Sequence, residues 1–413
     1  MGKRRSILVL LLLLALRPGV AAAQDWPQFR GPDGQGHSVE RGLPAQWSES
    51  QNIAWKVPVP GRGWSSPVVA TGRVWLTTAT PVGRETSLRL LSFDVATGRQ
   101  TLDVEVFRIG RSELLNAKNS HASPTPILEA DRVYVHFGAE GTAALLAAGG
   151  IVWKARHQCQ SQHGNGGSPA LFGDLLIFSC DGFDDSFVIA LDKLTGKTRW
   201  RTSRREPWSQ AYSTPLAIRV GDTTQIVSVG AFQAAAYDPQ SGKEIWRVRY
   251  PDGFSNVPRP VYGAGLVFIT TGFQQPVILA VRPDGRGDVT QTHVAWTLAR
   301  GAPLTPSPLL VGDELYVVTD AGVASSIDAR SGAILWQQRL GGSVSASPVL
   351  ADGRIYFLDE DGKTTVVKPG RIFQHIATNV LDGPTLASMA VASGSFFIRT
   401  ATHLYRIVES PSR

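Results

Sequence analysis

The sequence has little cysteine, no stripe of basic residues, and no long apolar run beyond its first residues. Only two of the 413 residues are cysteine, so the chain is not a small scaffold held by disulfides and must rest on a hydrophobic core. Beyond the N-terminus no stretch approaches the ~20 apolar residues of a membrane-spanning helix. Because lysine and arginine are not clustered, the sequence does not support nucleic-acid binding.

Residues 1–23 have the composition of a signal peptide. Basic residues at 3–5 precede a short apolar run at 7–16, and small residues at 21–23 offer a cleavage site. We therefore expect cleavage near Ala23, export to the periplasm or the medium, and no membrane span in the mature chain. No cysteine follows the site, so we do not expect a lipid anchor there. An uncleaved anchor is the alternative.

The charge of the chain lies mostly in this leader. The formal net charge is +7, from 41 basic and 34 acidic residues. The leader holds four basic residues and no acid, so its removal leaves 37 basic residues and a net charge of +3. The remaining 390 residues are enough for two domains, although large all-β folds of this length also form one unit.

A small residue followed by proline recurs at intervals of 40 to 59 residues. The steps are Ser66-Pro67, Thr125-Pro126, Ser168-Pro169, Thr214-Pro215, Ser307-Pro308 and Ser347-Pro348, with Arg259-Pro260 as a departure and 387–392 as a degenerate eighth start. Each is followed by two short apolar strands around a Gly-Asp or Asp-Gly turn, then by a polar loop and a hairpin. This period, without a helical pattern, is typical of four-stranded propeller blades.

The hairpin of each unit ends on tryptophan, as in ALDKLTGKTRW (190–200), AYDPQSGKEIW (236–246) and SIDARSGAILW (326–336). The turn glycine permits a positive φ, and the aspartate can accept hydrogen bonds from turn amides. The tryptophan is a large apolar plate, which we expect to pack between neighbouring blades. The residues expected in this structural role are Trp153, Trp200, Trp246, Trp296 and Trp336.

The two ends of the repeat array complement each other. Residues 53–59 (IAWKVPV) resemble a fourth strand with no unit before it, and the last unit has only three strands. Every strand needs a partner, and a ring of blades supplies one. We predict an all-β, eight-bladed propeller over residues 53–408, closed by strand 53–59 pairing with the last blade. Seven blades plus a stray hairpin is the alternative.

The flanking segments are short. Residues 24–52 cannot bury a core of their own, so we expect an arm packed on the ring, and residues 409–413 form a C-terminal tail. A closed ring leaves no edge that needs covering, so we expect a monomer.

The hairpin motif at 190–200 and 236–246 resembles the repeat of the quinoprotein dehydrogenase propellers, which bind pyrroloquinoline quinone (PQQ). The chain as a whole is similar to secreted proteins with PQQ-binding-like β-propeller repeats, as in its opening WPQFRGPDGQG and in GRGWSSP. The resemblance implies the fold and suggests PQQ. In those enzymes, however, the quinone is held outside the repeat, with adjacent disulfide-linked cysteines and a calcium site. This chain has no Cys-Cys pair and no match for the calcium ligands, so no cofactor is predicted.

A second resemblance is to the lipid-anchored outer-membrane assembly factor, an eight-bladed propeller that binds a protein partner without a cofactor. This likeness extends to architecture and not to partner-binding residues.

The loops that join successive blades are rich in polar and aromatic residues and are expected to meet at one mouth of the channel. Some of these residues suit an anionic or sugar ligand, through arginine and asparagine donors and aromatic stacking surfaces. Alternatively, they pack between blades. The ligand-binding candidates are Arg62, Trp64, Asn119, His121, His163, Asn165, Asp181, Trp208, Tyr212, Asn256 and Arg259.

His121, His163 and Asp181 are candidates for a metal or acid–base site, because imidazole and carboxylate suit zinc and similar ions. Their spacing fits no zinc motif, and the alternative is that they satisfy loop backbone groups. Cys159 and Cys180 fall on the same expected face. They form a disulfide that pins the loops of the third blade, or stay as buried thiols.

The leading functional interpretation is a secreted or periplasmic scaffold that binds a small molecule, a saccharide or an envelope protein at this mouth. A divergent PQQ-dependent or metal-assisted oxidoreductase, and an envelope assembly factor, are the alternatives. We lean against an enzyme and assign no catalytic residue.

Overall fold

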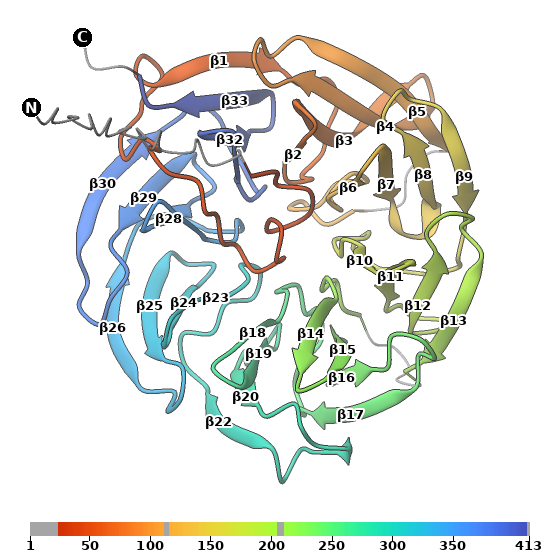
Figure 1. Ribbon diagram of the computed structural model, residues 1–413, viewed down its shortest axis with the longest axis vertical. Helices are drawn as coiled ribbons and strands as arrows, with labels where there is room; N and C mark the ends of the chain where they lie inside the picture. The colour runs from red at the N-terminus through yellow and green to blue at the C-terminus, as the bar shows by residue number, and fades with distance from the viewer. Residues whose placement is uncertain (1–23, 111–114, 205–209, 411–413) are drawn as a thin grey trace, which may run out of the picture.

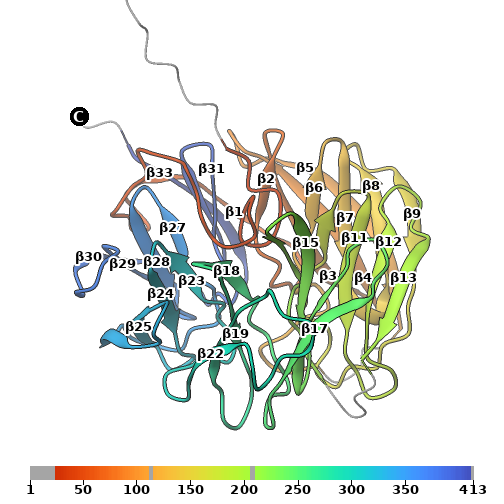
Figure 2. The same ribbon diagram turned by 60° about the horizontal axis from the view of Figure 1, so that its bottom comes forward.

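Each small-residue–proline step precedes a short strand, and the strands that follow these steps surround a central channel (Figure 1). The computed structural model describes residues 24–110, 115–204 and 210–410, which form eight β-sheets arranged as the blades of a propeller. The predicted fold class is confirmed. Seen from the side, the ring is a thick disc whose strands run between its two faces (Figure 2). The expected signal peptide, 1–23, lies outside the described residues.

The blades have the following strands. Blade 1 is β2 (Val68–Ala70), β3 (Arg73–Val82), β4 (Glu85–Asp94) and β5 (Gln100–Ile109); blade 2 is β6 (Ile127–Glu129), β7 (Arg132–His136), β8 (Thr142–Leu146) and β9 (Ile151–Ala155); blade 3 is β10 (Ala170–Phe172), β11 (Leu175–Cys180), β12 (Phe187–Asp192) and β13 (Thr198–Ser203); blade 4 is β14 (Leu216–Val220), β15 (Thr223–Val229), β16 (Gln233–Tyr237) and β17 (Glu244–Arg249).

The second half of the ring repeats the pattern. Blade 5 is β18 (Val261–Gly263), β19 (Leu266–Thr270), β20 (Ile278–Val281) and β22 (Val294–Leu298); blade 6 is β23 (Leu309–Val311), β24 (Glu314–Val318), β25 (Val323–Asp328) and β26 (Ile334–Arg339); blade 7 is β27 (Val349–Ala351), β28 (Arg354–Leu358), β29 (Lys363–Val367) and β30 (His375–Val380). The short β21 (Gly287–Asp288) adds to blade 4, and the one helical element of the described residues is a 3-10 turn, η1 (Gly138–Glu140).

The eighth sheet combines the first strand of the array with its last three strands. It consists of β31 (Ala390–Ala392), β32 (Ser395–Arg399), β33 (His403–Val408) and, as its outermost strand, β1 (Ile53–Pro58). β1 runs antiparallel to β33, with Val57 opposite Leu404. Separating β1 from β33 would therefore expose the outer edge of β33.

Neighbouring blades are joined on the outside of the ring by tryptophan. The indole N–H of Trp153 in blade 2 donates to the carbonyl of Lys193 in the turn of blade 3, at 3.0 Å. The ring of Trp153 lies over Gly196 of that turn, which has φ +72°. In the same turn, Asp192 Oδ1 accepts hydrogen bonds from the backbone N–H and hydroxyl of Thr195. The turn motif thus shapes the surface on which the preceding blade's tryptophan rests.

The same joint recurs around the ring. Equivalent indole-to-carbonyl hydrogen bonds join Trp55 to Val95, Trp200 to Pro239, Trp296 to Ala329 and Trp336 to Gly370. Trp246 departs from the pattern, because its N–H donates to the side-chain oxygen of Gln225 within its own blade. It is still fully buried in a core cluster with residues of blade 5.

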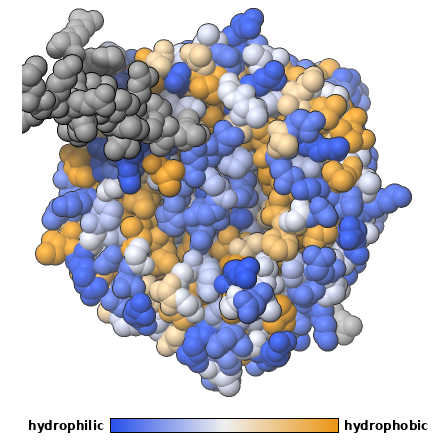
Figure 3. Space-filling model, viewed as in Figure 1, coloured by the Kyte–Doolittle hydropathy of each residue, from blue (hydrophilic) through white to orange (hydrophobic). Residues whose placement is uncertain are grey.

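An N-terminal segment, residues 24–52, crosses the centre of the ring (Figure 1). Its backbone exchanges hydrogen bonds with inner strands: Trp26 with Val69 of β2, and Gly36 with Leu350 of β27. Val69 and Leu350 lie in the first strands of their blades, shortly after the proline steps. The segment therefore covers the end of the channel at which these inner strands finish. In the view of Figure 1, mostly hydrophilic residues surround the ring centre (Figure 3). No helix in the described part of the chain has the length and hydropathy to cross a membrane.

We predict that Gly196→Ala destabilises the ring more than Gly173→Ala does. Both glycines have positive φ, but a Cβ at 196 would lie 2.5 Å from the Trp153 ring, whereas nothing lies within 4 Å of one at 173. Gly173→Ala has only the conformational cost, on the order of 1 kcal/mol, and Gly196→Ala adds an overpacking cost of about 1–3 kcal/mol. Guanidinium unfolding curves measure the difference. Equal losses would mean that the joint does not constrain this turn.

Candidate functional site

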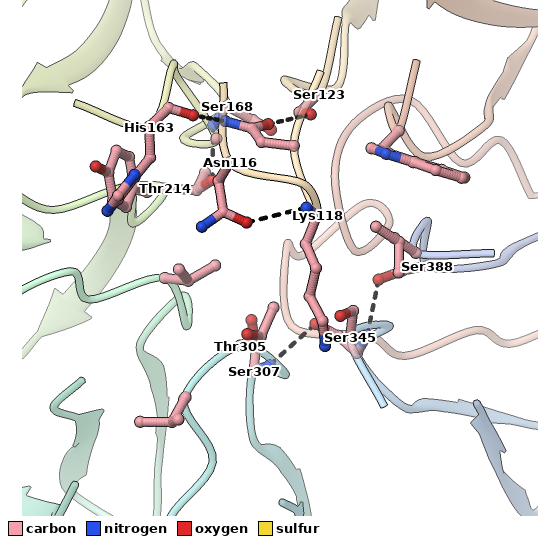
Figure 4. A pocket seen from close by; sticks show the side chains of 18 of the residues that line it. Asn116, Lys118, Ser123, His163, Ser168, Thr214, Thr305, Ser307, Ser345 and Ser388 are labelled. Atoms are coloured by element: carbon pink, nitrogen blue, oxygen red, sulfur yellow. Dashed lines mark hydrogen bonds between the residues drawn. The ribbon is translucent and has the colours of Figure 1, made fainter. Parts of the chain in front are cut away.

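The channel encloses a cavity of about 460 Å³. Its wall includes residues from the connections between all successive blades, and Phe29 of the N-terminal segment also lines it. Because that segment covers the end of the channel at which the inner strands finish, we describe the cavity as a cup whose mouth is formed by the blade-joining loops. Figure 4 shows side chains from opposite blades pointing into this space.

A circle of hydroxyl groups surrounds the cup. The residue before the proline of one unit donates its backbone N–H to the hydroxyl of the corresponding residue in the next unit, at 2.8–3.2 Å. The donor–acceptor pairs are Ser66–Thr125, Thr125–Ser168, Ser168–Thr214, Arg259–Ser307, Ser307–Ser347, Ser347–Ser388 and Ser388–Ser66. All seven hydroxyls line the cavity. We call this set the hydroxyl circle.

Arg259 interrupts the circle because it stands where the other units have serine or threonine. It is 3% exposed. Its Nη2 and Nε donate to the carbonyl of Pro215, and its Nη1 donates to the carbonyl of Phe29 in the N-terminal segment. Burial lowers the pKa of the Arg259 guanidinium to about 10, so it stays charged near neutral pH. This residue ties the segment to the ring rather than lining the cup.

The rim of the cup carries most of its titratable groups. Lys118 Nζ lies 2.7 Å from Glu360 Oε1, and this ion pair links the loop before blade 2 to a loop of blade 7. Asp320 Oδ2 accepts the backbone N–H groups of Leu304 and Thr305. His163 lies with its ring 6.4 Å from that of Tyr212.

An aromatic ridge lies beside the mouth. The ring centroids of Phe232 and Phe254 are 6.0 Å apart, and those of Phe254 and Phe273 are 5.6 Å apart. Phe273 is 54% exposed and also lines the cavity. Phe232 adopts φ +61°, an uncommon conformation for a bulky residue. We call Phe232, Phe254 and Phe273 the aromatic ridge.

A buried ion pair supports the loops of blades 3 and 4. Asp181 Oδ2 and Arg204 Nη1 are 2.6 Å apart, and both side chains are almost fully buried. The other oxygen of Asp181 has no hydrogen-bond partner among the described residues. Burial raises the pKa of Asp181 to about 6, although the Arg204 guanidinium opposes the shift. Asn256 is also buried and donates to the carbonyl of Gly230 in the same region.

The candidate residues from the sequence separate into two groups. Trp64, Asn119, His163 and Tyr212 line the cup. The other described candidates do not line it: Arg62, whose guanidinium donates to the carbonyl of Ala117; His121; Asn165, which packs against Gly138; and the buried Asp181, Asn256 and Arg259. Trp208 lies outside the described residues.

The metal candidates from the sequence are His121, His163 and Asp181. Asp181 is committed to Arg204, and His163 belongs to the cup. Within residues 24–110, 115–204 and 210–410, no group of three or more histidine, cysteine, aspartate or glutamate side chains is placed to hold a metal ion.

Cys159 and Cys180 are joined by a disulfide with Cα atoms 5.9 Å apart. It links the loop before blade 3 to the end of β11, next to Asp181. The disulfide therefore holds the same loop base as the ion pair between Asp181 and Arg204.

The sequence reasoning missed the hydroxyl circle, Lys118 and the aromatic ridge. The hydroxyl circle had a visible signal, the serine or threonine before most of these prolines. That residue was interpreted only as the start of a strand. Lys118 and the three phenylalanines come from loops that the repeat does not control, so no periodicity marks them.

Comparison with known proteins gives consistent matches. A family model described as outer membrane protein assembly factor BamB matches residues 38–175, 184–307 and 234–371. The outer membrane protein assembly factor BamB of Yersinia pestis is 25% identical over 254 residues, which cover 56% of this chain and 58% of that protein. The chain thus spans under two thirds of this curated relative.

Solved structures share the fold. The crystal structure of BamB from Moraxella catarrhalis has a TM-score of 0.58 at 12% identity, over 86% of this chain and 99% of that one. The computationally designed Ika8 protein has a TM-score of 0.59 at 11% identity, over 89% of this chain and 100% of that one. At these identities the likeness concerns architecture alone.

We predict that Arg204→Met destabilises the protein by about 3–5 kcal/mol at pH 7, because it leaves a buried carboxylate without its partner. The loss is expected to be smaller at pH 5. A carboxyl whose pKa is raised on folding binds its proton more tightly in the folded state, so stability increases as pH falls from about 6 towards the unfolded value near 4.

Urea unfolding of both proteins at pH 7 and pH 5 measures the effect. The control is Arg330→Met, which removes an exposed pair with Asp313 and is expected to cost under about 1 kcal/mol at either pH. Equal losses for the two variants would show that the Asp181–Arg204 pair does not hold the loop base.

Proposed function

Because this chain belongs to the family described as outer membrane protein assembly factor BamB, we propose that it is a protein-binding scaffold of the bacterial cell envelope. The relative in Yersinia pestis is named as an assembly factor of outer membrane proteins. The expected signal peptide, with cleavage near Ala23, is consistent with a periplasmic location, where such a scaffold would meet its partner.

The aromatic ridge is the observation that carries this proposal. Aromatic side chains are enriched among the residues that dominate binding energy in protein interfaces, and a cluster of phenylalanines at a surface has a solvation cost that a partner removes. Phe232, Phe254 and Phe273 come from three separate loops on blades 4 and 5. The rigid ring holds these loops at fixed positions, so the ridge is available without folding on binding.

The occupant we propose is a protein segment with an apolar side chain that packs on Phe254 and Phe273. The polar mouth of the cup beside the ridge, with Asn116 and the Lys118–Glu360 pair, would form the hydrophilic border of such an interface.

The quinone of the resembled dehydrogenases fits the cup poorly. PQQ carries several carboxylates and works with a calcium ion, so its site needs cationic groups and carboxylate ligands for the metal. Among the described residues, Lys118 is the one lysine or arginine that lines the cavity, and its ammonium is paired with Glu360. The carboxylate of Asp320 accepts two backbone N–H groups. We therefore derive no redox step for this chain and favour binding over oxidation.

We predict that a photo-crosslinking amino acid at position 273 captures one discrete envelope protein, whereas the same group at position 372 does not. Ile372 is 73% exposed and lies between β29 and β30, away from the ridge. Phe273→Asp is expected to weaken binding of the identified partner at least ~10-fold, as expected for a central aromatic contact, and Ile372→Asp is expected to leave it unchanged.

The partner would be identified by mass spectrometry and its affinity measured with purified proteins. Equal capture from both positions, or affinity that is insensitive to Phe273→Asp, would contradict docking at the ridge.

A further inference from the structure

The cup has chemistry that the docking of a protein at the ridge does not use. Its wall presents many hydrogen-bond donors and a few aromatic faces in an enclosed space. We propose that the cup is a binding site for a neutral saccharide. This inference concerns the cavity and not the ridge, so it stands or falls separately from the proposed function.

The first argument is the orientation of the hydroxyl circle. Each of its hydroxyl oxygens accepts a backbone N–H from the preceding unit. None of these hydroxyls donates to an acceptor among the described residues. Since a hydroxyl has one proton and two lone pairs, and one lone pair is used, the proton remains for a ligand or for water in the cavity. The circle is therefore a ring of donors that suits a ligand with many oxygen acceptors.

A further donor lies at the mouth of the cup. Asn116 uses its side-chain oxygen to accept the backbone N–H of Lys118, which leaves its NH₂ group without a described acceptor. Figure 4 shows Asn116 and Lys118 reaching into the space above the circle. An oxygen-rich occupant of the cup can accept a hydrogen bond from this amide.

The second argument is charge. An anion would also accept hydrogen bonds, but the single lysine of the described wall is neutralised at 2.7 Å by Glu360. The wall also contains the carboxylate of Asp320. Within the described residues the lining thus offers no unpaired lysine or arginine to a carboxylate or phosphate. An uncharged ligand with many oxygens accepts hydrogen bonds from these donors without the cost of burying an unpaired charge.

The third argument is shape. The aromatic residues Trp64, Tyr212 and Phe29 line the same cavity. Aromatic faces pack against the apolar C–H faces of sugar rings, while the hydroxyls of a sugar reach the donors beside them. The volume of about 460 Å³ lies within the ~300–1,000 Å³ of small-molecule sites. Phe29 at the covered end makes the cup a dead end that a ligand enters from the mouth.

The experiment is calorimetric titration of the mature chain with individual sugars. The neutral panel is glucose, N-acetylglucosamine, maltose and trehalose, and the charged panel is glucuronate, citrate and inorganic phosphate, each up to ~10 mM, tenfold above a Kd of about 1 mM. We expect saturable 1:1 binding of at least one neutral sugar and weaker binding of the charged compounds.

Variants locate the binding. Trp64→Ala removes an aromatic face from the wall and is expected to weaken binding ~2–10-fold, the range for one aromatic contact. Asn116→Ala, at an exposed position that the fold does not depend on, is expected to weaken it by a similar factor. The matched control, Gln240→Ala, removes an exposed amide in a turn outside the cavity and should leave affinity unchanged.

Three results would overturn the proposal. They are tighter binding of phosphate or citrate than of every neutral sugar, sugar binding that neither Trp64→Ala nor Asn116→Ala alters, and no heat from any neutral sugar, which would mean a water-filled cup. None of these bears on crosslinking from position 273, so failure of the sugar site and failure of the protein-docking site are distinguishable.

Discussion

The circle of hydrogen bonds from the backbone N–H of one unit to the hydroxyl of the next is the interaction on which the rest of the structure depends. Proline restricts the preceding residue to extended conformations, so its N–H points along the circumference instead of into its own blade. The hydroxyl of the next unit lies where it can accept this proton, as from Ser66 to Thr125. The inner strands are thereby held at a common height, which defines a channel and places the same hydroxyls on its wall.

Tryptophan has the corresponding role on the outside. An indole such as that of Trp153 binds the turn of the next blade through both its ring and its N–H. The two sets of contacts fix each blade at its inner and outer edges. In the eighth sheet, β1 supplies the outer strand and Trp55 supplies the joint to blade 1. Both ends of the array therefore belong to one cooperative ring.

This rigidity lets the loops differ freely. At blade 3, the disulfide fixes the loop before the blade to the end of β11, and the neighbouring Asp181–Arg204 pair fixes the loop that leads to blade 4. Above them lie the aromatic ridge and the mouth of the cup, with apolar surface on one side and hydrogen-bond donors on the other. The proposed protein partner and the proposed saccharide would use these neighbouring surfaces by different chemistry.

The eight-bladed all-β architecture was predictable from the sequence, because the proline steps and tryptophan hairpins are local patterns that repeat in every blade. Trp64, Asn119, His163 and Tyr212 were also predictable as cavity residues, since loops at equivalent places in the repeat meet at one face. Asp181, Asn256 and Arg259 were not placed correctly. Whether a polar loop residue faces the channel or a buried partner depends on contacts with other blades, and for Arg259 with Phe29, which is 230 residues away in the chain. Periodicity determined the ring, but side-chain direction and charge pairing across blades are properties of the assembled ring, so only the tertiary structure decided which residues form the cup.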